Sequence, residues 1–263
     1  MGNNQHTNTD GKTVALEPWV TVDKVLGGKL VLRQPEIGYR FAIDPVLMAA
    51  AVPVRPGEKV LDLGSGVGTA TFCLLTREPE TDVTGLEIQD DVNKLAINNA
   101  ADNGFSGPMN FVCGDLRNRK ILPPKSFHHV MANPPHFEGG SHTPPGHAGR
   151  ATANVEEGAN LKDWVKAACY WARDRGTITF IHRADRLHQL IQAMEGQCGD
   201  VSIMPFWPRA GRPARRVLVQ ALKGSRGPAR MLPGITLHDP VDKYSAEARA
   251  ILEQGQAIDL TSW

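Results

Sequence analysis

Hydrophobic positions along the chain change their spacing repeatedly from about residue 58 onward. Short continuous apolar runs predict buried strands, and they alternate with segments whose apolar residues recur at helical spacing. The predicted strands are residues 58–64, 82–88, 109–115, 127–133 and 176–184. The predicted helices are residues 69–78, 89–104, 161–174 and 186–196.

Short apolar strands separated by helices are typical of a parallel sheet that is covered on both faces. The pattern therefore predicts an α/β fold with a doubly wound, mostly parallel, Rossmann-like sheet, in which ligands bind beyond the carboxyl ends of the strands. Residues 200–207 and 215–222 predict a terminal antiparallel strand pair. Residues 139–160 and 223–234, which are rich in Gly and Pro, predict loops.

The same pattern predicts the domain organisation. We expect a flexible N-terminus over residues 1–20 and a short strand and helix extension over residues 21–57. The core domain covers residues 58–223, and residues 224–263 form a C-terminal extension that packs on it.

Composition and charge narrow the class of protein only slightly. The chain has 263 residues, of which 41% are hydrophobic and 22% charged, which is typical of a globular protein with a full core. Because the net charge is only +1, a nucleic acid or a membrane would have to bind a local patch of basic residues.

Cysteine spacing and hydropathy predict the cellular setting. Four cysteines without a CxxC pair suggest neither a disulfide framework nor a zinc site, so we expect no metal and a reducing, cytoplasmic environment. The first dozen residues are polar and no stretch has transmembrane length, so we expect no membrane partner. No feature indicates an obligate protein partner.

The first segment with chemical meaning is VLDLGSGVG, residues 60–68. Gly64, Gly66 and Gly68, with Ser65 between the first two, follow a strand and open a helix, so the backbone can turn sharply and approach a ligand. The spacing is GxGxG, because Thr69 stands where a dinucleotide-binding GxGxxG would have glycine.

Three acidic residues lie at or just past the ends of successive predicted strands. Asp62 precedes the glycine loop, and a carboxylate there suits a cation rather than a pyrophosphate. Glu87, followed by Ile88, is placed to accept hydrogen bonds from ribose hydroxyls. Asp115 is placed to accept from an adenine amino group, with Leu116 offering its backbone N–H. Together they favour S-adenosyl-L-methionine over NAD, although singly each carboxylate also fits a helix N-terminus or a strand end.

An Asn and two prolines end the fourth predicted strand. Pro134 and Pro135 have fixed φ angles and no N–H groups, so with Asn133 they form a rigid turn that presents oxygens. The Asn133 side-chain oxygen and the Pro134 carbonyl would each accept a hydrogen from an exocyclic NH₂ group and orient its lone pair toward a methyl donor. His136 or Phe137 would stack on the plane of the substrate.

The motifs VLDLGSGVG, GLEI, GDL and ANPPH occur in the order found in class I S-adenosylmethionine-dependent methyltransferases, and the chain resembles their amino-methylating NPP branch over about residues 58–183. The resemblance implies that Asp62, Gly64, Gly66, Glu87 and Asp115 bind the cofactor, which is released as S-adenosyl-L-homocysteine. The usual Tyr or Phe after NPP is His136 here. We therefore expect either His136 or Phe137 to stack on the substrate base.

Residues 27–53 are similar to the short N-terminal portion of bacterial tRNA adenine-N6 methyltransferases that modify valine tRNA beside the anticodon. This resemblance implies tRNA as the substrate. Asp44, at the start of a predicted helix, fits an ordinary cap residue better than a ligand of the methionine ammonium, and Arg40 has no assigned role.

From residue 209 to residue 230 the chain has seven Arg or Lys residues and no acidic one. This is either a solvated loop or an RNA-binding patch, in which Phe206 and Trp207 would stack on bases while arginines contact phosphates. The candidate phosphate contacts are Arg209, Arg212, Arg215 and Arg216.

Other side chains are expected to be structural. His128 and His129 fit strand residues without a catalytic role, and Trp164 and Trp171 fit a core-facing helix.

The favoured function is therefore methylation of an exocyclic amine, the N6 of an adenine in the anticodon-loop region of tRNA. A protein-glutamine N5 methyltransferase and an rRNA guanine-N2 methyltransferase stay open, because their substrates also present a planar NH₂ group that the motif cannot distinguish. The non-enzyme alternative is an inactive cofactor-binding relative.

Overall fold

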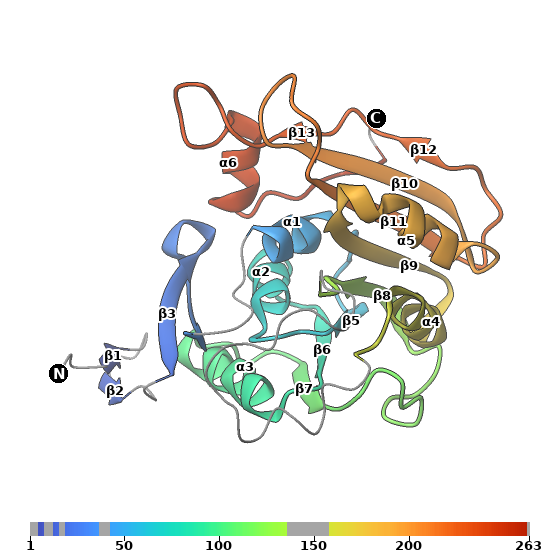
Figure 1. Ribbon diagram of the computed structural model, residues 1–263. Helices are drawn as coiled ribbons and strands as arrows, with labels where there is room; N and C mark the ends of the chain where they lie inside the picture. Colours follow the sequence, from blue (N-terminus) through green and yellow to red (C-terminus); the bar gives the residue numbers. More distant parts are fainter. Residues whose placement is uncertain (1–4, 8–12, 16–18, 37–42, 136–157, 262–263) are drawn as a thin grey trace.

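The computed structural model describes residues 5–7, 13–15, 19–36, 43–135 and 158–261. In this part of the chain a nine-stranded sheet runs through the centre of the molecule (Figure 1). Its order is β12-β10-β11-β9-β8-β5-β6-β7, and β13 also pairs with β10. The strands are β5 (Lys59–Leu63), β6 (Asp82–Glu87), β7 (Met109–Cys113), β8 (Phe127–Ala132), β9 (Ala172–Arg183), β10 (Cys198–Trp207), β11 (Arg216–Lys223), β12 (Arg230–Met231) and β13 (Ile235–Thr236).

Strand directions confirm the predicted fold class. β5 is parallel to β6 and β8, β6 is parallel to β7, and β8 is parallel to β9. β11 runs antiparallel to both β9 and β10, so the expected antiparallel pair is present. The pair is not terminal, because the short strands β12 and β13 follow it and run parallel to β10.

Helices cover both faces of the sheet, as the sequence pattern predicts. α1 (Asp44–Ala51), α2 (Thr69–Arg77) and α6 (Ala246–Leu252) contribute to one apolar cluster, and α3 (Asp90–Asp102) packs against it through Ala100. α4 (Leu161–Trp171) and α5 (Leu187–Met194) contribute to another. Two 3₁₀ turns complete the helical elements, η1 (Leu26–Gly28) and η2 (Ala184–Arg186).

Alternation along the strands explains why the two clusters form. Successive side chains of a strand point to opposite faces of a sheet. In β8, Met131 joins the α1–α2 cluster, whereas Val130 and Ala132 join the α4–α5 cluster. In β9, Ile181 joins the α1–α2 cluster and Phe180 joins the α4–α5 cluster. Apolar residues at every position of a strand therefore indicate burial on both faces.

The N-terminal extension forms strands of its own. β3 (Val20–Val25) and β4 (Leu30–Pro35) are a hairpin, and β1 (Gln5–Thr7) pairs separately with β2 (Thr13–Ala15). The hydrophobic pattern did not predict the β1–β2 pair.

The strongest attachment of the hairpin is to α3. Asn99 and Asn103 lie one helical turn apart and bond β4 as a neighbouring strand would. Asn99 accepts from Arg33 N (2.7 Å) and donates to Arg33 O (3.0 Å). Asn103 accepts from Val31 N (2.9 Å) and donates to Val31 O (2.8 Å). A buried ion pair between Arg33 and Asp102 (2.6 Å) adds to this attachment.

Two predicted boundaries were wrong. The helix predicted to reach residue 174 ends at Trp171, and β9 begins at Ala172. Asp174 lies in the strand and pairs with Lys125 (3.0 Å). The loop predicted over residues 223–234 contains β12, because Arg230 pairs with Ser202 across the sheet.

Candidate functional site

The predicted site residues collect at one edge of the sheet. Leu63 of β5 is in register with Leu86 of β6 and with Ala132 of β8, so the carboxyl ends of these strands are level. The order of the strands reverses here, because β6 follows β5 on one side and β8 flanks it on the other. Such a switch point is where open α/β sheets bind ligands.

The glycine loop after β5 has the backbone conformation that its sequence predicts. Gly64, Gly66 and Gly68 have φ angles of 75°, 56° and 86°, which side chains with a Cβ rarely adopt. A Cβ on Gly64 would overlap the Trp164 ring of α4. A Cβ on Gly66 would meet no atom within 4 Å. Gly64 is therefore needed for packing, whereas Gly66 leaves open space above the loop.

Glu87 ties this loop to the end of β6. Its side chain is buried, with Oε2 accepting from Gly66 N (3.0 Å) and Oε1 from Gln89 N (2.9 Å). Because a carboxylate has about four acceptor sites, lone pairs remain for further donors.

Asp62 lies beneath the loop. Its carboxylate is 2% exposed and accepts from the Thr71 hydroxyl of α2 (2.8 Å). Burial raises the pKa of Asp62 to about 7, and the hydrogen bonds from Thr71 oppose that rise. The negative charge of Asp62 is therefore costly in the ligand-free protein, and a cation above the loop would favour it.

Two buried hydroxyls of the loop have no partner in the described part of the chain. They are Ser65 Oγ and Thr69 Oγ1. Buried polar groups in folded proteins are almost always hydrogen-bonded, so these two are available to a polar ligand in the loop. The loop therefore fits a polar ligand by its open backbone and by these hydroxyls.

Asp115, just past the end of β7, has a side-chain partner that the sequence analysis did not expect. Asp115 makes a two-point contact with Arg117, whose Nη2 lies 2.6 Å from Asp115 Oδ2, and this contact holds the pKa of Asp115 below its usual value. Leu116 is buried, whereas Ile88 is 59% exposed and presents an apolar side chain at the end of β6. The sequence analysis did not anticipate Arg117 as a partner.

The Asn-Pro-Pro turn directly follows β8. Asn133 is half-buried, Pro134 is buried and Pro135 is exposed. His136 and Phe137, the two candidates for stacking on the substrate, lie outside the described residues, as does Arg40. The sheet register thus brings Asn133 to the same edge as the glycine loop.

Asp44 was wrongly interpreted as a helix cap. Ile43 occupies the N-cap position of α1, and Asp44 is the first helical residue. The buried carboxylate of Asp44 accepts from Arg216 Nε (2.7 Å), which joins α1 to β11. The structure therefore gives both Asp44 and Arg216 a structural contact.

Residues 208–215, which join β10 to β11, form a segment that we call the arginine hairpin. Arg209, Arg212 and Arg215 are exposed on it. The expectation that Phe206 stacks on bases was wrong, because Phe206 is fully buried in the α1–α2 cluster. Trp207, the next residue, is partly exposed.

Asn99 is a residue that the sequence analysis missed. Besides its bonds to β4, its amide donates to Val67 O of the glycine loop (3.0 Å). It therefore links the N-terminal hairpin to the candidate site. The only signal in the sequence is the spacing of Asn99 and Asn103 on one face of a helix.

Other candidates have structural contacts. His129 bonds Thr177 Oγ1 (2.6 Å) and Glu58 Oε2 (2.8 Å), and burial lowers its pKa. Trp164 and Trp171 are buried, as predicted. Among the residues described, no cluster of His, Cys, Asp or Glu could hold a metal ion. No described helix is long and apolar enough to cross a membrane.

The sheet, with a glycine loop after β5, a carboxylate at the end of β6 and Asn-Pro-Pro after β8, has the arrangement that the sequence analysis expects of a class I methyltransferase. Residues 43–153 match the family model described as the methyltransferase small domain.

Comparison with known proteins supports this class. A tRNA1(Val) (adenine(37)-N6)-methyltransferase of Actinobacillus pleuropneumoniae is 25% identical over 178 residues, which cover 67% of this chain and 73% of the relative.

Two solved structures share the fold. A "predicted O-methyltransferase" from Agrobacterium tumefaciens has a TM-score of 0.68 at 24% identity, covering 81% of this chain and 97% of its own. TYW2 of M. jannaschii in complex with AdoMet has a TM-score of 0.54 at 12% identity, covering 83% of this chain and 91% of its own.

Proposed function

We propose that this protein transfers a methyl group from S-adenosyl-L-methionine to the exocyclic N6 amine of an adenine in tRNA, in the region of the anticodon loop. The observation that carries the proposal is the turn of Asn133, Pro134 and Pro135, in which the prolines have no N–H groups, held level with the glycine loop at the carboxyl edge of the sheet. S-adenosyl-L-homocysteine is the second product.

The residues around the glycine loop fit this cofactor. Glu87 retains acceptor capacity for ribose hydroxyls, and the open space above Gly66 lets a ligand approach the backbone. The unpartnered hydroxyls of Ser65 and Thr69 are available to the polar end of the ligand. When bound, S-adenosylmethionine supplies an electrophilic methyl group on a sulfonium.

The adenine end of the cofactor is assigned to the next two strand ends. Ile88 presents its exposed side chain to a purine face, and Leu116 offers its backbone N–H. Asp115 would accept from the adenine amine with lone pairs that Arg117 leaves unused.

The amine is positioned by two oxygens. Asn133 Oδ1 and the Pro134 carbonyl each accept one hydrogen of the NH₂ group, which directs the nitrogen lone pair at the methyl carbon. The two prolines cannot offer competing N–H donors. His136 or Phe137 stacks on the base, so the plane of the ring is fixed as well.

The choice of tRNA rests on the named relative and on charge. The relative from A. pleuropneumoniae is named as a tRNA adenine-N6 enzyme. The arginine hairpin offers Arg209, Arg212 and Arg215 to RNA phosphates. Arg216, the fourth arginine of the expected set, pairs with Asp44 and contributes less.

Incubation of the protein with labelled S-adenosylmethionine and, separately, with unfractionated tRNA, ribosomal RNA and a release factor tests the proposal. Label in tRNA, recovered as N6-methyladenosine, is the expected result. Label in the release factor would favour a glutamine-N5 enzyme, and label in guanine of ribosomal RNA would favour a guanine-N2 enzyme. No label in any of them, with cofactor bound, would indicate a relative that has lost turnover.

A further inference from the structure

We propose that a second unpaired nucleotide of the RNA substrate binds in a hollow between Trp207 and the arginine hairpin, with its base stacked on the indole. This inference rests on the proposed function and adds a binding site to it. The hollow has a volume of about 540 Å³ and is lined by Trp207, Ala210, Gly211, Arg212, Pro213 and Thr236. Sites for small organic ligands typically have volumes of about 300–1,000 Å³.

The hollow lies at the edge of the sheet that carries the candidate site. Arg216 pairs with Arg183 at the carboxyl end of β9, and Phe206 pairs with Arg216, so Trp207 lies beyond that same edge. β10 is separated from β8 by β9 and β11, which is three strand spacings. At roughly 4.8 Å per spacing, Trp207 is about 14 Å across the sheet from Asn133. One RNA loop can reach both positions.

The indole of Trp207 is held in place by the segment that carries β13. Its Nε1 donates to Pro233 O (3.1 Å), and its backbone oxygen accepts from Leu237 N (2.8 Å). A Cβ on Gly234 would lie 2.8 Å from Trp207 Nε1, so this close contact depends on a glycine. A ring fixed before binding loses little freedom when a base stacks on it.

The charges around the hollow favour a nucleotide. Arg183 pairs with Asp185 and Arg216 pairs with Asp44. Within the ranges that the structure describes, Arg209, Arg212 and Arg215 form no ion pair. An aromatic face beside unpaired guanidinium groups is the combination that binds single-stranded RNA, through stacking and phosphate contacts.

Kinetics of tRNA methylation test this site, with Trp207→Leu, Trp207→Phe and Arg212→Ala compared with wild type. Arg226→Ala is the matched control, because Arg226 is exposed on the loop after β11, at the opposite edge of the sheet. Since stacking of one base contributes about 1–3 kcal/mol, we expect Trp207→Leu to raise KM for unfractionated tRNA by about 5- to 150-fold. Trp207→Phe should recover part of the loss. Arg212→Ala should reduce the logarithmic salt slope of KM by about 0.7.

The cofactor Kd should stay near wild type for each variant. The Tm should stay near wild type for Arg212→Ala, whereas Trp207→Leu loses the bond to Pro233 O and should have a lower Tm. A Trp207→Leu protein that is folded and has an unchanged KM would overturn the site while leaving the proposed function intact. If Trp207→Leu does not fold, an unchanged KM and salt slope for Arg212→Ala would overturn it instead. If the wild-type protein labels the release factor and no RNA, the proposed function itself fails.

A separate observation concerns two thiols on the α4–α5 side of the sheet. Cys169 Sγ in α4 lies 3.5 Å from Cys198 Sγ at the start of β10. We infer that this pair is a modification site, which a hydroperoxide oxidises to an intramolecular disulfide.

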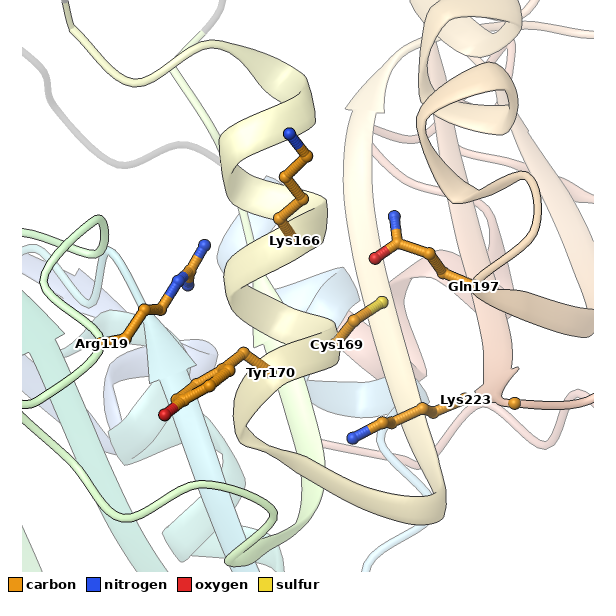
Figure 2. A pocket seen from close by; sticks show the side chains of 7 residues that line it. Arg119, Lys166, Cys169, Tyr170, Gln197 and Lys223 are labelled. Carbon is orange, nitrogen blue, oxygen red and sulfur yellow. The ribbon is translucent and has the colours of Figure 1, made fainter.

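The surroundings of Cys169 suit such a reaction. Its side chain lines a cleft of about 480 Å³ together with the basic residues Arg119, Lys166 and Lys223 (Figure 2). The hydrogen bond with Cys198 lowers the pKa of the Cys169 thiol against the rise that burial causes, and Lys223 and Arg119 lower it further. In the reaction, the Cys169 thiolate attacks one peroxide oxygen, the O–O bond breaks and hydroxide leaves. Cys198 sulfur then attacks the resulting sulfenic sulfur, the S–O bond breaks and water leaves with the Cys198 proton.

Peptide mapping after treatment with hydrogen peroxide and alkylation of remaining thiols tests the inference. We expect a cross-linked peptide that contains residues 169 and 198, and its loss on reduction. In Cys198→Ser, a sulfenic-acid probe should label Cys169, whereas Cys169→Ser should show little label at Cys198. Cys113→Ser is the control, since Cys113 is an exposed thiol without a nearby cysteine partner. Full alkylation of both Cys169 and Cys198 after peroxide treatment would overturn the inference.

Discussion

At the scale of single residues, the buried carboxylate of Asp62 gives the ligand-free protein a pH-dependent stability. Its pKa is about 7 in the folded protein and 3.8 in the unfolded chain. Between these values the folded state binds more protons, so the free energy of unfolding falls as pH rises. From pH 5 to pH 8 the loss is about 2–3 kcal/mol.

Urea unfolding of wild type and of Asp62→Asn at pH 5 and pH 8 measures this loss. The variant removes the ionisable group, so its stability should change less over the same interval. Equal changes in both proteins would mean that Asp62 keeps an ordinary pKa.

The sequence predicted the positions of the candidate site residues better than the contacts that these residues make. The positions of Asp62, Glu87 and Asn133 follow from their place at strand ends, which parallel strands bring together. The contact of Asp44 with Arg216 joins residues 172 apart, and no local pattern encodes such a pair.

At the scale of elements, the glycine loop offers a matched pair of substitutions. Gly64→Ala places a methyl group against the Trp164 ring, so it should destabilise the fold by about 1–3 kcal/mol. Gly66→Ala meets open space and should cost only about 1 kcal/mol of backbone strain, yet its methyl group occupies the region assigned to the cofactor. Calorimetry with S-adenosylmethionine and thermal unfolding separate the two effects. A Gly66→Ala protein with wild-type cofactor affinity would contradict the assignment of the loop.

Asn99 of α3 and Asn103 at its C-cap provide a second pair, because of these two only Asn99 bonds the glycine loop. Asn103→Ala removes the bonds to Val31 of β4. Asn99→Ala removes the bonds to Arg33 of β4 and, in addition, the bond to Val67 O. Each variant should lose about 1–3 kcal/mol of stability, since buried partners are left unpaired. Only Asn99→Ala should also weaken cofactor binding. Equal cofactor affinities in the two variants would mean that the link from the N-terminal hairpin through Asn99 to the glycine loop does not affect cofactor binding.

Most elements follow from the hydrophobic pattern, and the exceptions have local causes. The end of α4 was missed because residues 172–174, Ala-Arg-Asp, favour a helix over a strand by intrinsic propensity, and the pairing of β9 with β8 overrides that preference. β12 and β13 have two residues each, which is too short for a pattern to reveal.

At the scale of the whole molecule, the C-terminal half extends the sheet, so that the arginine hairpin lies at the same edge as the glycine loop. The four arginines proposed from the sequence then divide into two kinds. Arg216→Ala leaves the buried Asp44 carboxylate without this partner, and it should destabilise the protein by roughly 1–3 kcal/mol.

The combined substitution of Arg209, Arg212 and Arg215 by Ala should leave the Tm unchanged and raise KM for tRNA, with a weaker dependence on salt. Measurements of Tm and of KM at several salt concentrations distinguish the two kinds. A stable Arg216→Ala protein with a raised KM would instead place Arg216 in the RNA path.

The most direct test of the proposed reaction is nucleoside analysis of tRNA after a single turnover with wild type and with Asn133→Ala. Asn110→Ala, on the exposed side of β7, is the control. We expect N6-methyladenosine from wild type and from the control, and a rate lower by about 10²- to 10³-fold for Asn133→Ala, with an unchanged Kd for S-adenosylmethionine. A near-normal rate for Asn133→Ala, or a product methylated on a ring carbon, would contradict the account.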